Sequence, residues 1–434
     1  MARVLLVSYH YPPTSAVGAL RVAKFAKYLP EFGWDPVVLS AETRENAPAT
    51  ASEGIAPVVR APVWPGPGSV YRLIQRLRPR RGDRHVDLTF EQKDTIRPGL
   101  RATLKRTLVS LQSWPDGAFG WWAPGVLAAR KLMGEGGYSA IVTTGPPHTA
   151  HLIGLALRRS GVRWIADFRD PWVNNPGKSR SIRSTLSDTF DRRAEAAVVK
   201  RADAVLSTTA QLRRQFLDRY PGRATRFHTV INGVDYDDFT GVRNHANLKF
   251  TIAHFGTMYY KRSPDPLFAA ARFLVDAGVL PRETVALVFA GCTEDGIDLQ
   301  AAARRHGVSE LLEMVGLVSR PRALEMMVNA GALLLFAQDQ PLQIPAKAYE
   351  YIASGRPIIA VTGEGATADL IRRTGAGTVV GGDDAEALRA AILDAYNAWK
   401  RQPFDGPSQR PRDPHLDRRR LTGQLAALLC GDAC

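Results

Sequence analysis

The sequence has no long apolar run and few cysteines. No apolar run approaches the roughly 18 residues that a membrane-spanning helix needs. Residues 1–8 have an apolar core too short for a secretory signal, and no small-residue cleavage site follows it. The three cysteines, Cys292, Cys430 and Cys434, show neither metal-ligand spacing nor an even disulfide framework. We therefore expect a cytoplasmic protein with reduced thiols.

Acidic residues are also in deficit. The chain has 57 Lys and Arg against 42 Asp and Glu, which gives a formal net charge of +15. This excess favours an anionic partner, and nucleic acid, membrane headgroups and a phosphorylated ligand all fit it. With 434 residues, of which 45% are hydrophobic, the composition is that of a globular protein, and its length favours two domains.

Short apolar runs alternate with longer segments of helical period along most of the chain. Such an alternation is typical of parallel α/β sheets, and each half has enough runs for one doubly wound sheet. The predicted strands are 4–8, 36–39, 140–144, 164–167 and 204–208 in the first half, and 250–254, 286–290, 332–336, 357–361 and 377–380 in the second.

A turn signal at 232–235 (NGVD), followed by a polar stretch, predicts the domain junction. We expect a first domain at 1–235, a linker at 236–249 and a second domain at 250–402. Residues 403–434 are expected to form a polar connector and a short amphipathic helix.

An insertion at about 70–110 interrupts the alternation. Its basic residues are interleaved with Tyr71, Leu73, Ile74 and Leu77. A segment that docks on anionic lipid and a solvated insertion are equally compatible with this pattern. The basic residues are Arg72, Arg76, Arg78, Arg80, Arg81, Arg84, Lys93, Arg97, Arg101, Lys105 and Arg106.

The loops that follow predicted strands are the candidate binding sites, because open α/β sheets bind ligands at the carboxyl ends of their strands. Gly18 lies in a loop before a helix and would let backbone N–H groups approach an anion, although a plain turn fits equally well. In the second half, Gly256 and Thr257 follow a strand and precede Arg262, whose guanidinium could hold phosphate oxygens bidentately.

Further candidates surround the strand 357–361. Lys347 and Glu350 are three residues apart, so they are neighbours on one helical face, where a surface ion pair is the alternative interpretation. A small-residue turn then opens the next helix. It comprises Gly363, Glu364, Gly365, Ala366 and Thr367.

Several motifs occur in a fixed order along nearly the whole chain. They are YHYPP at 9–13 with Gly18, WPD at 114–116 with GW at 120–121, GPPH at 145–148 with HLIG at 151–154, IADFRDPW at 165–172, INGVD at 231–235, and IP at 344–345 through Lys347 and Glu350 to Pro357. In this set the chain resembles the family-4 retaining glycosyltransferases of GT-B fold, in the branch of bacterial polysaccharide and lipopolysaccharide assembly.

The resemblance implies two Rossmann-like, doubly wound domains that face an interdomain cleft. The N-terminal domain would bind the acceptor, the C-terminal domain would bind a nucleotide-diphosphate sugar, and the last helix would return to the N-terminal domain. By position, Arg262 and Lys347 would hold the donor diphosphate and Glu350 the ribose hydroxyls. The turn Gly316-Leu317-Val318 would meet the base.

One position departs from the family pattern. The first glutamate of the family's paired motif is replaced by Leu342, so Asp339, Gln340 and Gln343 are the candidates for contacting the donor sugar. Departure of a nucleoside diphosphate develops negative charge that fixed cations stabilise. We therefore expect transfer without a metal or other cofactor, and the resemblance implies retention of anomeric configuration.

Four polar residues follow strands of the first half and are acceptor-side candidates: His148, His151, Asp167 and Asp170. A histidine or aspartate there would orient or deprotonate an acceptor hydroxyl. A helix-capping aspartate or a packed histidine is the alternative. The acceptor would be a glycan, a lipid-linked saccharide or a small molecule, reached in the cytoplasm or at an anionic inner membrane face.

Four alternatives stay open from the sequence. A nucleotide-sugar epimerase or an inverting transferase would use the same fold, and Leu342 is compatible with a non-catalytic relative. Nucleic-acid binding is suggested by the net charge alone and is not expected.

Overall fold

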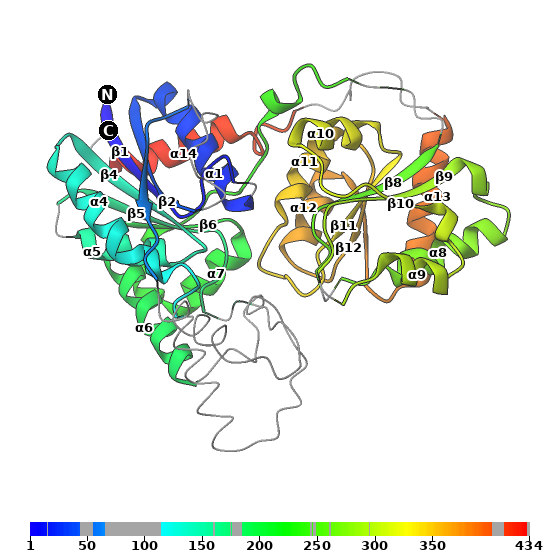
Figure 1. Ribbon diagram of the computed structural model, residues 1–434, viewed down its shortest axis with the longest axis horizontal. Coiled ribbons are helices and arrows are strands. Elements are labelled where there is room, and N and C mark those ends of the chain that lie inside the picture. The colour runs from blue at the N-terminus through cyan, green and yellow to red at the C-terminus, as the bar shows by residue number, and fades with distance from the viewer. Residues whose placement is uncertain are drawn as a thin grey trace, which may run out of the picture. The chain divides into compact units, whose positions relative to one another are not determined.

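The computed structural model describes residues 1–14, 16–43, 55–65, 114–158, 161–173, 175, 185–243, 245, 249–259, 262–294, 296–401 and 412–431. Two compact units make up the chain (Figure 1). Unit 1 comprises Met1–Ile231 with Arg419–Cys434, and unit 2 comprises Asn232–Arg418. The basic residues predicted as an insertion at about 70–110 lie outside the described residues, as does most of the predicted connector.

Unit 1 contains a seven-stranded parallel sheet in the order β3-β2-β1-β4-β5-β6-β7. Its strands are β1 (Ala2–Ser8), β2 (Trp34–Glu42), β3 (Val58–Pro62), β4 (Tyr138–Gly145), β5 (Arg163–Phe168), β6 (Ala204–Ser207) and β7 (Phe227–Thr229). Its helices are α1 (Val17–Tyr28), α4 (Trp122–Gly134), α5 (Thr149–Leu157), α6 (Thr185–Arg201), α7 (Ala210–Arg219) and α14 (Arg418–Cys430), with short 3₁₀ turns at η1 (Leu29–Phe32), η3 (Phe119–Trp121) and η5 (Pro221–Arg226).

Alternation along β1 divides the apolar core of unit 1 into two layers. Leu5 and Val7 pack with residues of α4, α5, α6 and α7 on one face. Val4 and Leu6 pack on the other face with α1 and with Leu421 of α14. The last helix of the chain therefore covers the same sheet face as the first helix (Figure 1).

Unit 2 contains a six-stranded parallel sheet in the order β10-β9-β8-β11-β12-β13. Its strands are β8 (Phe250–Phe255), β9 (Val285–Ala290), β10 (Leu312–Met314), β11 (Ala332–Phe336), β12 (Ile358–Val361) and β13 (Gly377–Val380). Its helices are α8 (Asp265–Asp276), α9 (Leu299–Arg305), α10 (Arg320–Asn329), α11 (Ala346–Ser354), α12 (Ala366–Thr374) and α13 (Ala385–Arg401), with 3₁₀ turns η6 (Tyr236–Phe239), η7 (Arg282–Thr284) and η8 (Ser309–Leu311).

The two sheets share one strand order, in which the third, second, first and fourth strands of the unit are neighbours. The order reverses between β1 and β4 in unit 1 and between β8 and β11 in unit 2, and ligands of open α/β sheets bind at such reversals. The predicted doubly wound α/β architecture is confirmed. The sequence did not predict β3, β7 and β10, which are edge or near-edge strands without a long apolar run.

The described cysteines differ in their thiol state. Cys292 is a free, exposed thiol, whereas Cys430 is disulfide-bonded, so the expectation of reduced thiols throughout was wrong for Cys430. Among the described helices, none is both long enough and apolar enough to cross a membrane.

Candidate functional site

The loop that follows β8 begins with a close approach between two strand ends. Gly256 has φ of +130°, and its N–H donates to the carbonyl of Ala290 at the end of β9. Gly291, next in line, has φ of +150°, and a Cβ there would lie 2.1 Å from the carbonyl oxygen of Gly256. Both positions therefore need glycine, which keeps the loop flat against the sheet edge.

Arg262 ends this loop as a cation held by backbone and by an aromatic ring. Its Nη1 donates to the carbonyl of Thr257 at 3.3 Å, and its guanidinium carbon lies 4.7 Å from the centre of the Tyr259 ring. Burial lowers the pKa of Arg262, while Tyr259 and Glu294 act in the opposite direction. Among the described residues, no carboxylate forms an ion pair with Arg262, so this cation retains donors for an anion.

Helix α11 carries a second charged group at the same sheet edge. Lys347 Nζ donates to Glu350 Oε2 at 2.8 Å, as expected for neighbours on one helical face. Arg320 Nη1 donates to Glu350 Oε1 at 2.6 Å, and its Nη2 donates to Asp238 Oδ2 at 2.8 Å. Burial alone would raise the pKa of Glu350, but Lys347 and Arg320 hold it below its usual value. Glu350 is therefore an ionised, buried acceptor between two cations.

Sequence reasoning missed Arg320. It is the first residue of α10, where a cation is unfavourable because the helix dipole places positive charge at the N-terminus. Its position in the sequence could have indicated its role, because a basic residue at the start of a helix needs a carboxylate partner elsewhere in the chain. Glu350 and Asp238 supply that partner.

Tyr351 connects the loop of Arg262 to α11. Its hydroxyl accepts the N–H of Phe255, the last residue of β8, at 2.8 Å. Burial raises the pKa of Tyr351, Glu350 raises it further, and Arg262 lowers it. Tyr351 therefore lies close enough to interact electrostatically with charged residues of both predicted donor-binding elements.

The predicted turn at 363–367 lies against the loop that carries Leu342. Gly365 has φ of +148°, and a Cβ there would meet Pro341 Cα at 2.6 Å. Thr367 is buried and donates from Oγ1 to the carbonyl of Gln343. Ala366 is buried as well, while Gly363 is exposed and Glu364 pairs with Arg372 at the surface.

The loop after β11 offers candidates for the position that Leu342 leaves without a carboxylate. Asp339 has φ of +58°, a left-handed conformation that costs energy for a residue with a Cβ. Gln338, which sequence reasoning did not select, has a buried Oε1 without a hydrogen-bond partner among the described residues. A buried amide oxygen in this state favours an additional donor, such as a sugar hydroxyl.

The predicted base-contacting turn follows β10. Gly316 has φ of +74°, and Leu317 is 81% exposed. Val318 is partly exposed and precedes α10 by two residues. The turn therefore presents an apolar surface to solvent at the carboxyl end of its strand.

Both predicted histidines at the sheet edge of unit 1 are buried among aromatic rings. His148 is 2% exposed and stacks on Trp172, and His151 is 0% exposed and stacks on Phe168. His151 Nδ1 shares a hydrogen bond of 2.9 Å with Thr143 Oγ1, and burial lowers the pKa of His151 to about 3. The aromatic cluster encloses both rings, and their role towards an acceptor stays a prediction.

Asp167 is likewise internal. It is 0% exposed and pairs with Arg21 through two hydrogen bonds of 2.9 and 2.8 Å. Arg21 also donates to the carbonyls of Val230 and Ile231, so the pair joins α1, β5 and the end of β7. A role of Asp167 towards an acceptor stays a prediction, and Asp170, the other predicted aspartate, is partly exposed.

Gly18 makes room for an arginine that sequence reasoning did not assign. A Cβ at Gly18 would lie 2.1 Å from Arg169 Nη1, and Arg169 Nη2 donates to the carbonyl of Pro146. The guanidinium therefore connects the loops after β1 and β4, where the strand order reverses. Burial lowers the pKa of Arg169, and Asp170 and Asp167 oppose that effect.

Metal-binding residues do not gather at either sheet edge. Within the described part of the chain, no three or more His, Cys, Asp or Glu side chains are arranged to hold a metal ion. The polar groups at the edge of unit 2 are instead cations around one carboxylate, a set suited to phosphate oxygens and hydroxyls.

Comparison with solved structures agrees with the fold. Sucrose-phosphate synthase from Thermosynechococcus elongatus has a TM-score of 0.61 at 16% identity, covering 99% of this chain and 98% of that one. WaaG, a glycosyltransferase involved in lipopolysaccharide biosynthesis, has a TM-score of 0.56 at 15% identity, covering 99% of this chain and all of the other. At these identities the likeness shows the fold, and it confirms the predicted GT-B architecture.

Sequence comparisons address the family. A D-inositol 3-phosphate glycosyltransferase of Geodermatophilus obscurus is 27% identical over 255 residues, 53% of this chain and 56% of that protein. The chain thus spans about half the length of the curated relatives it matches. Residues 18–233 match a glycosyl transferase 4-like domain, and residues 249–398 match the glycosyl transferases group 1. With both domains present in this order, the chain belongs to the glycosyltransferases.

Proposed function

We propose that the protein transfers a sugar from a nucleotide-diphosphate sugar to an acceptor hydroxyl, with retention of anomeric configuration and without a metal. The glycosyltransferase domains favour transfer over epimerisation or nucleic-acid binding. The observation that carries the proposal is the set of charged groups at the carboxyl edge of the unit 2 sheet. There, Tyr351 belongs to α11, the helix that carries Lys347, and it also interacts electrostatically with Arg262 of the loop after β8.

In this proposal each charged residue has a separate task. Arg262 and Lys347 bind the diphosphate and stabilise the negative charge that develops as it leaves. Glu350 accepts hydrogen bonds from the ribose hydroxyls, and Arg320 keeps it ionised and in place. The flat loop at Gly256 and Gly291 lets backbone approach the phosphates.

The donor sugar would be held by the loop after β11. Gln338 has an unsatisfied buried oxygen, and Asp339, Gln340 and Gln343 lie within the next five residues. These residues would contact the donor sugar in place of the first glutamate of the family's paired motif, which is Leu342 in this chain. We do not assign one of them alone, since each can bond a hydroxyl.

A thermal-shift panel of nucleoside diphosphates and nucleotide sugars tests the donor assignment. A ligand that binds only the folded state, present at 100 times its Kd, stabilises it by about 2.7 kcal/mol. We expect one base to give a clear rise in Tm as the diphosphate and none as the free nucleoside at equal concentration. The absence of a rise with every nucleotide would overturn the assignment.

Two product measurements test the reaction. NMR of the new anomeric linkage should show the configuration of the donor, and inversion would contradict retention. Turnover should persist after treatment with a chelator, and loss of turnover that Mg²⁺ or Mn²⁺ restores would contradict metal independence.

We further propose that the acceptor is lipid-linked and that unit 1 docks on an anionic membrane. Its surface carries an aromatic patch, defined as Trp64, Trp114, Phe119, Trp122 and Phe190. Trp114 lies 5.8 Å from Phe119 and 5.9 Å from Phe190, and Phe119 stacks on Trp122 at 6.0 Å.

Three rings of the patch are exposed, and the sequence that links two of its members is basic. Trp64 is 50% exposed, Trp122 36% and Phe190 37%. By sequence, the chain between Trp64 and Trp114 carries eleven Lys or Arg and four Asp or Glu. Exposed aromatic rings suit the boundary between headgroups and acyl chains, and a basic sequence suits an anionic bilayer.

Vesicle co-sedimentation tests the docking surface. We expect binding to vesicles with anionic lipid, weaker binding to neutral vesicles, and a loss of binding when Trp64 and Phe190 are both changed to Ser. Phe273→Ser is the matched control, since Phe273 is 54% exposed on α8 of unit 2, outside the patch. Equal losses in the two variants would contradict the proposal.

A further inference from the structure

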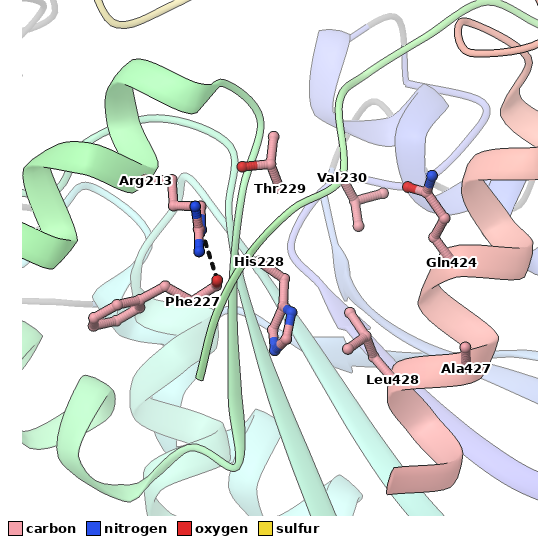
Figure 2. A pocket seen from close by; sticks show the side chains of 8 residues that line it. All are labelled: Arg213, Phe227, His228, Thr229, Val230, Gln424, Ala427 and Leu428. Atoms are coloured by element: carbon pink, nitrogen blue, oxygen red, sulfur yellow. Dashed lines mark hydrogen bonds between the residues drawn. The ribbon is translucent and has the colours of Figure 1, made fainter. Parts of the chain in front are cut away.

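A pocket of ≈460 Å³ lies in unit 1 between β7 and α14, and none of its lining residues is among those proposed for the donor. Figure 2 shows His228 of β7 directed towards α14, beside Leu428, and Arg213 of α7 bonded to the carbonyl of Phe227, the preceding residue of β7. The lining residues are Arg213, Phe227, His228, Thr229, Val230, Gln424, Ala427 and Leu428.

Arg213 is the charged side chain that lines this pocket, and Arg163 bonds the backbone of α14 at Leu428. Arg213 Nε donates to the carbonyl of Phe227 at 2.7 Å, and Arg163 Nε donates to the carbonyl of Leu428 at 2.6 Å. Among the described residues, neither arginine forms an ion pair with a carboxylate. Each guanidinium is thus fixed by one backbone bond, and its positive charge is not neutralised locally.

The surroundings of His228 show the same excess of positive charge. Burial lowers the pKa of His228, and the cations Arg213 of α7 and Arg163 of β5 lower it further. The residues of α14 that line the pocket are uncharged. An anion seated there would relieve the repulsion between the two arginines and a protonated His228.

Hydrogen-bond donors reach the pocket from several elements. Arg213 has guanidinium N–H groups beyond the one bonded to Phe227, and Gln424 of α14 offers its amide. No hydrogen bond joins the side chains of His228 or Gln424 to a residue in the described ranges. Donors from more than one element suit a tetrahedral oxyanion better than a planar carboxylate, which has two oxygens.

The apolar part of the lining indicates more than a bare ion. Val230, Ala427 and Leu428 supply a wall beside the basic groups. A ligand that combines a phosphate with a short carbon skeleton would satisfy both halves of the lining.

We propose that the pocket between β7 and α14 binds a phosphate ester, with Arg213 and His228 holding the phosphate and Leu428 and Val230 the carbon skeleton. This is a second anion site, and it does not depend on the donor assignment. The phosphate belongs either to a small soluble ester or to a lipid headgroup, and both present the same group to Arg213.

The test follows the ring resonances of His228 by NMR during titration with inorganic phosphate, glycerol 3-phosphate and acetate. Arg262→Gln/Lys347→Gln protein is used so that phosphate binding at the proposed donor site does not contribute. We expect both phosphate compounds to shift His228 and raise its pKa, glycerol 3-phosphate to bind more tightly, and acetate to bind at least roughly tenfold more weakly. His228→Gln identifies the resonance.

Two variants separate binding from folding. Arg213→Gln should weaken glycerol 3-phosphate by roughly 10–150-fold, since bonds to charged groups contribute about 1.5–3 kcal/mol. Arg226→Gln is the control, because Arg226 also bonds a backbone carbonyl, that of Ala202, but does not line the pocket. Equal weakening by both variants, or equal affinity for acetate and phosphate, would overturn the proposal.

Vesicles containing phosphatidic acid distinguish the source of the phosphate. If the ligand is a lipid headgroup, Arg213→Gln reduces binding to these vesicles while Arg226→Gln does not. If the ligand is a soluble ester, the two variants bind vesicles equally and only the titration with glycerol 3-phosphate responds to Arg213.

Discussion

The two sheets have the same strand order, yet their carboxyl edges differ in the state of their charged groups. In unit 1, Arg21 and Asp167 neutralise each other in the interior, and His148 and His151 are packed among aromatic rings. In unit 2, Arg262 forms no ion pair with a described carboxylate.

Exposure separates the two edges as well. Lys347 and Arg320 share the carboxylate of Glu350 with side chains that are 34% and 35% exposed, whereas those of Arg21 and Asp167 are 2% and 0% exposed. The same topological position therefore carries a buried, neutralised pair in unit 1 and partly exposed charged groups in unit 2, where we propose that the donor binds. We expect substitutions at the first edge to change stability and substitutions at the second to change donor affinity.

The largest expected effect is on stability, at Asp167. Asp167→Ala leaves Arg21 buried without its carboxylate, and removing one partner of a buried pair costs about 3–5 kcal/mol. Urea unfolding monitored by tryptophan fluorescence measures this loss. Asp276→Asn, which breaks the exposed pair with Arg272, should cost less than about 1 kcal/mol. Similar losses in the two variants would remove the distinction between an internal and an exposed pair.

The next effect is on donor affinity, at Glu350. Glu350→Gln should weaken binding of the nucleoside diphosphate by roughly 10–150-fold, because the ribose hydroxyls lose a charged acceptor worth about 1.5–3 kcal/mol. Calorimetric titration measures the affinity, and pyrophosphate, which lacks ribose, should bind no more weakly than to the native protein. Glu325→Gln on the surface of α10 is the control and should leave both affinities unchanged.

A smaller, pH-dependent effect is expected from the buried histidines. Burial lowers the pKa of His151 to about 3 and that of His254 in unit 2 to about 4, against 6.5 in the unfolded chain. At a pH between the folded-state and the unfolded-state pKa of a histidine, only the unfolded chain binds the extra proton. The free energy of unfolding is therefore highest above pH 6.5 and falls as the pH drops towards 3. Each proton contributes a slope of about 1.4 kcal/mol per pH unit.

Urea unfolding at several pH values measures that slope. His151→Phe, which keeps a ring against Phe168, should make the slope for unit 1 shallower. An unchanged slope would show that His151 binds its proton equally well in the folded and the unfolded protein. That result would support an acceptor-side role for His151.

Much of the fold was predictable because it depends on local patterns. Apolar runs located β11 and β13 to the residue, and the turn at 232–235 lies where unit 1 gives way to unit 2. The missed strands β7 and β10 have three residues each, too few for a pattern, and they form by pairing with neighbours. Tertiary pairing, which a local pattern does not contain, decides such strands.

The site was predictable only in part, for a related reason. The spacing of Lys347 and Glu350 sufficed to place them together, because a helix fixes which residues are neighbours. Arg320 joins the same group from 30 residues away, and no spacing indicates that contact. The burial of His148 and His151 depends on Trp172 and Phe168, which come from elsewhere in the chain.

The account rests on Arg262 and Lys347 binding one diphosphate, and a double-mutant cycle on nucleoside diphosphate affinity tests it most directly. Calorimetry on the native protein, Arg262→Gln, Lys347→Gln and the double variant should show a loss of roughly 10–150-fold for each single change and a coupling energy of about 0.5–3 kcal/mol between them. Binding of the nucleoside without phosphates should be unchanged. Nucleoside diphosphate affinity that survives both substitutions, or losses that add without coupling, would contradict the account.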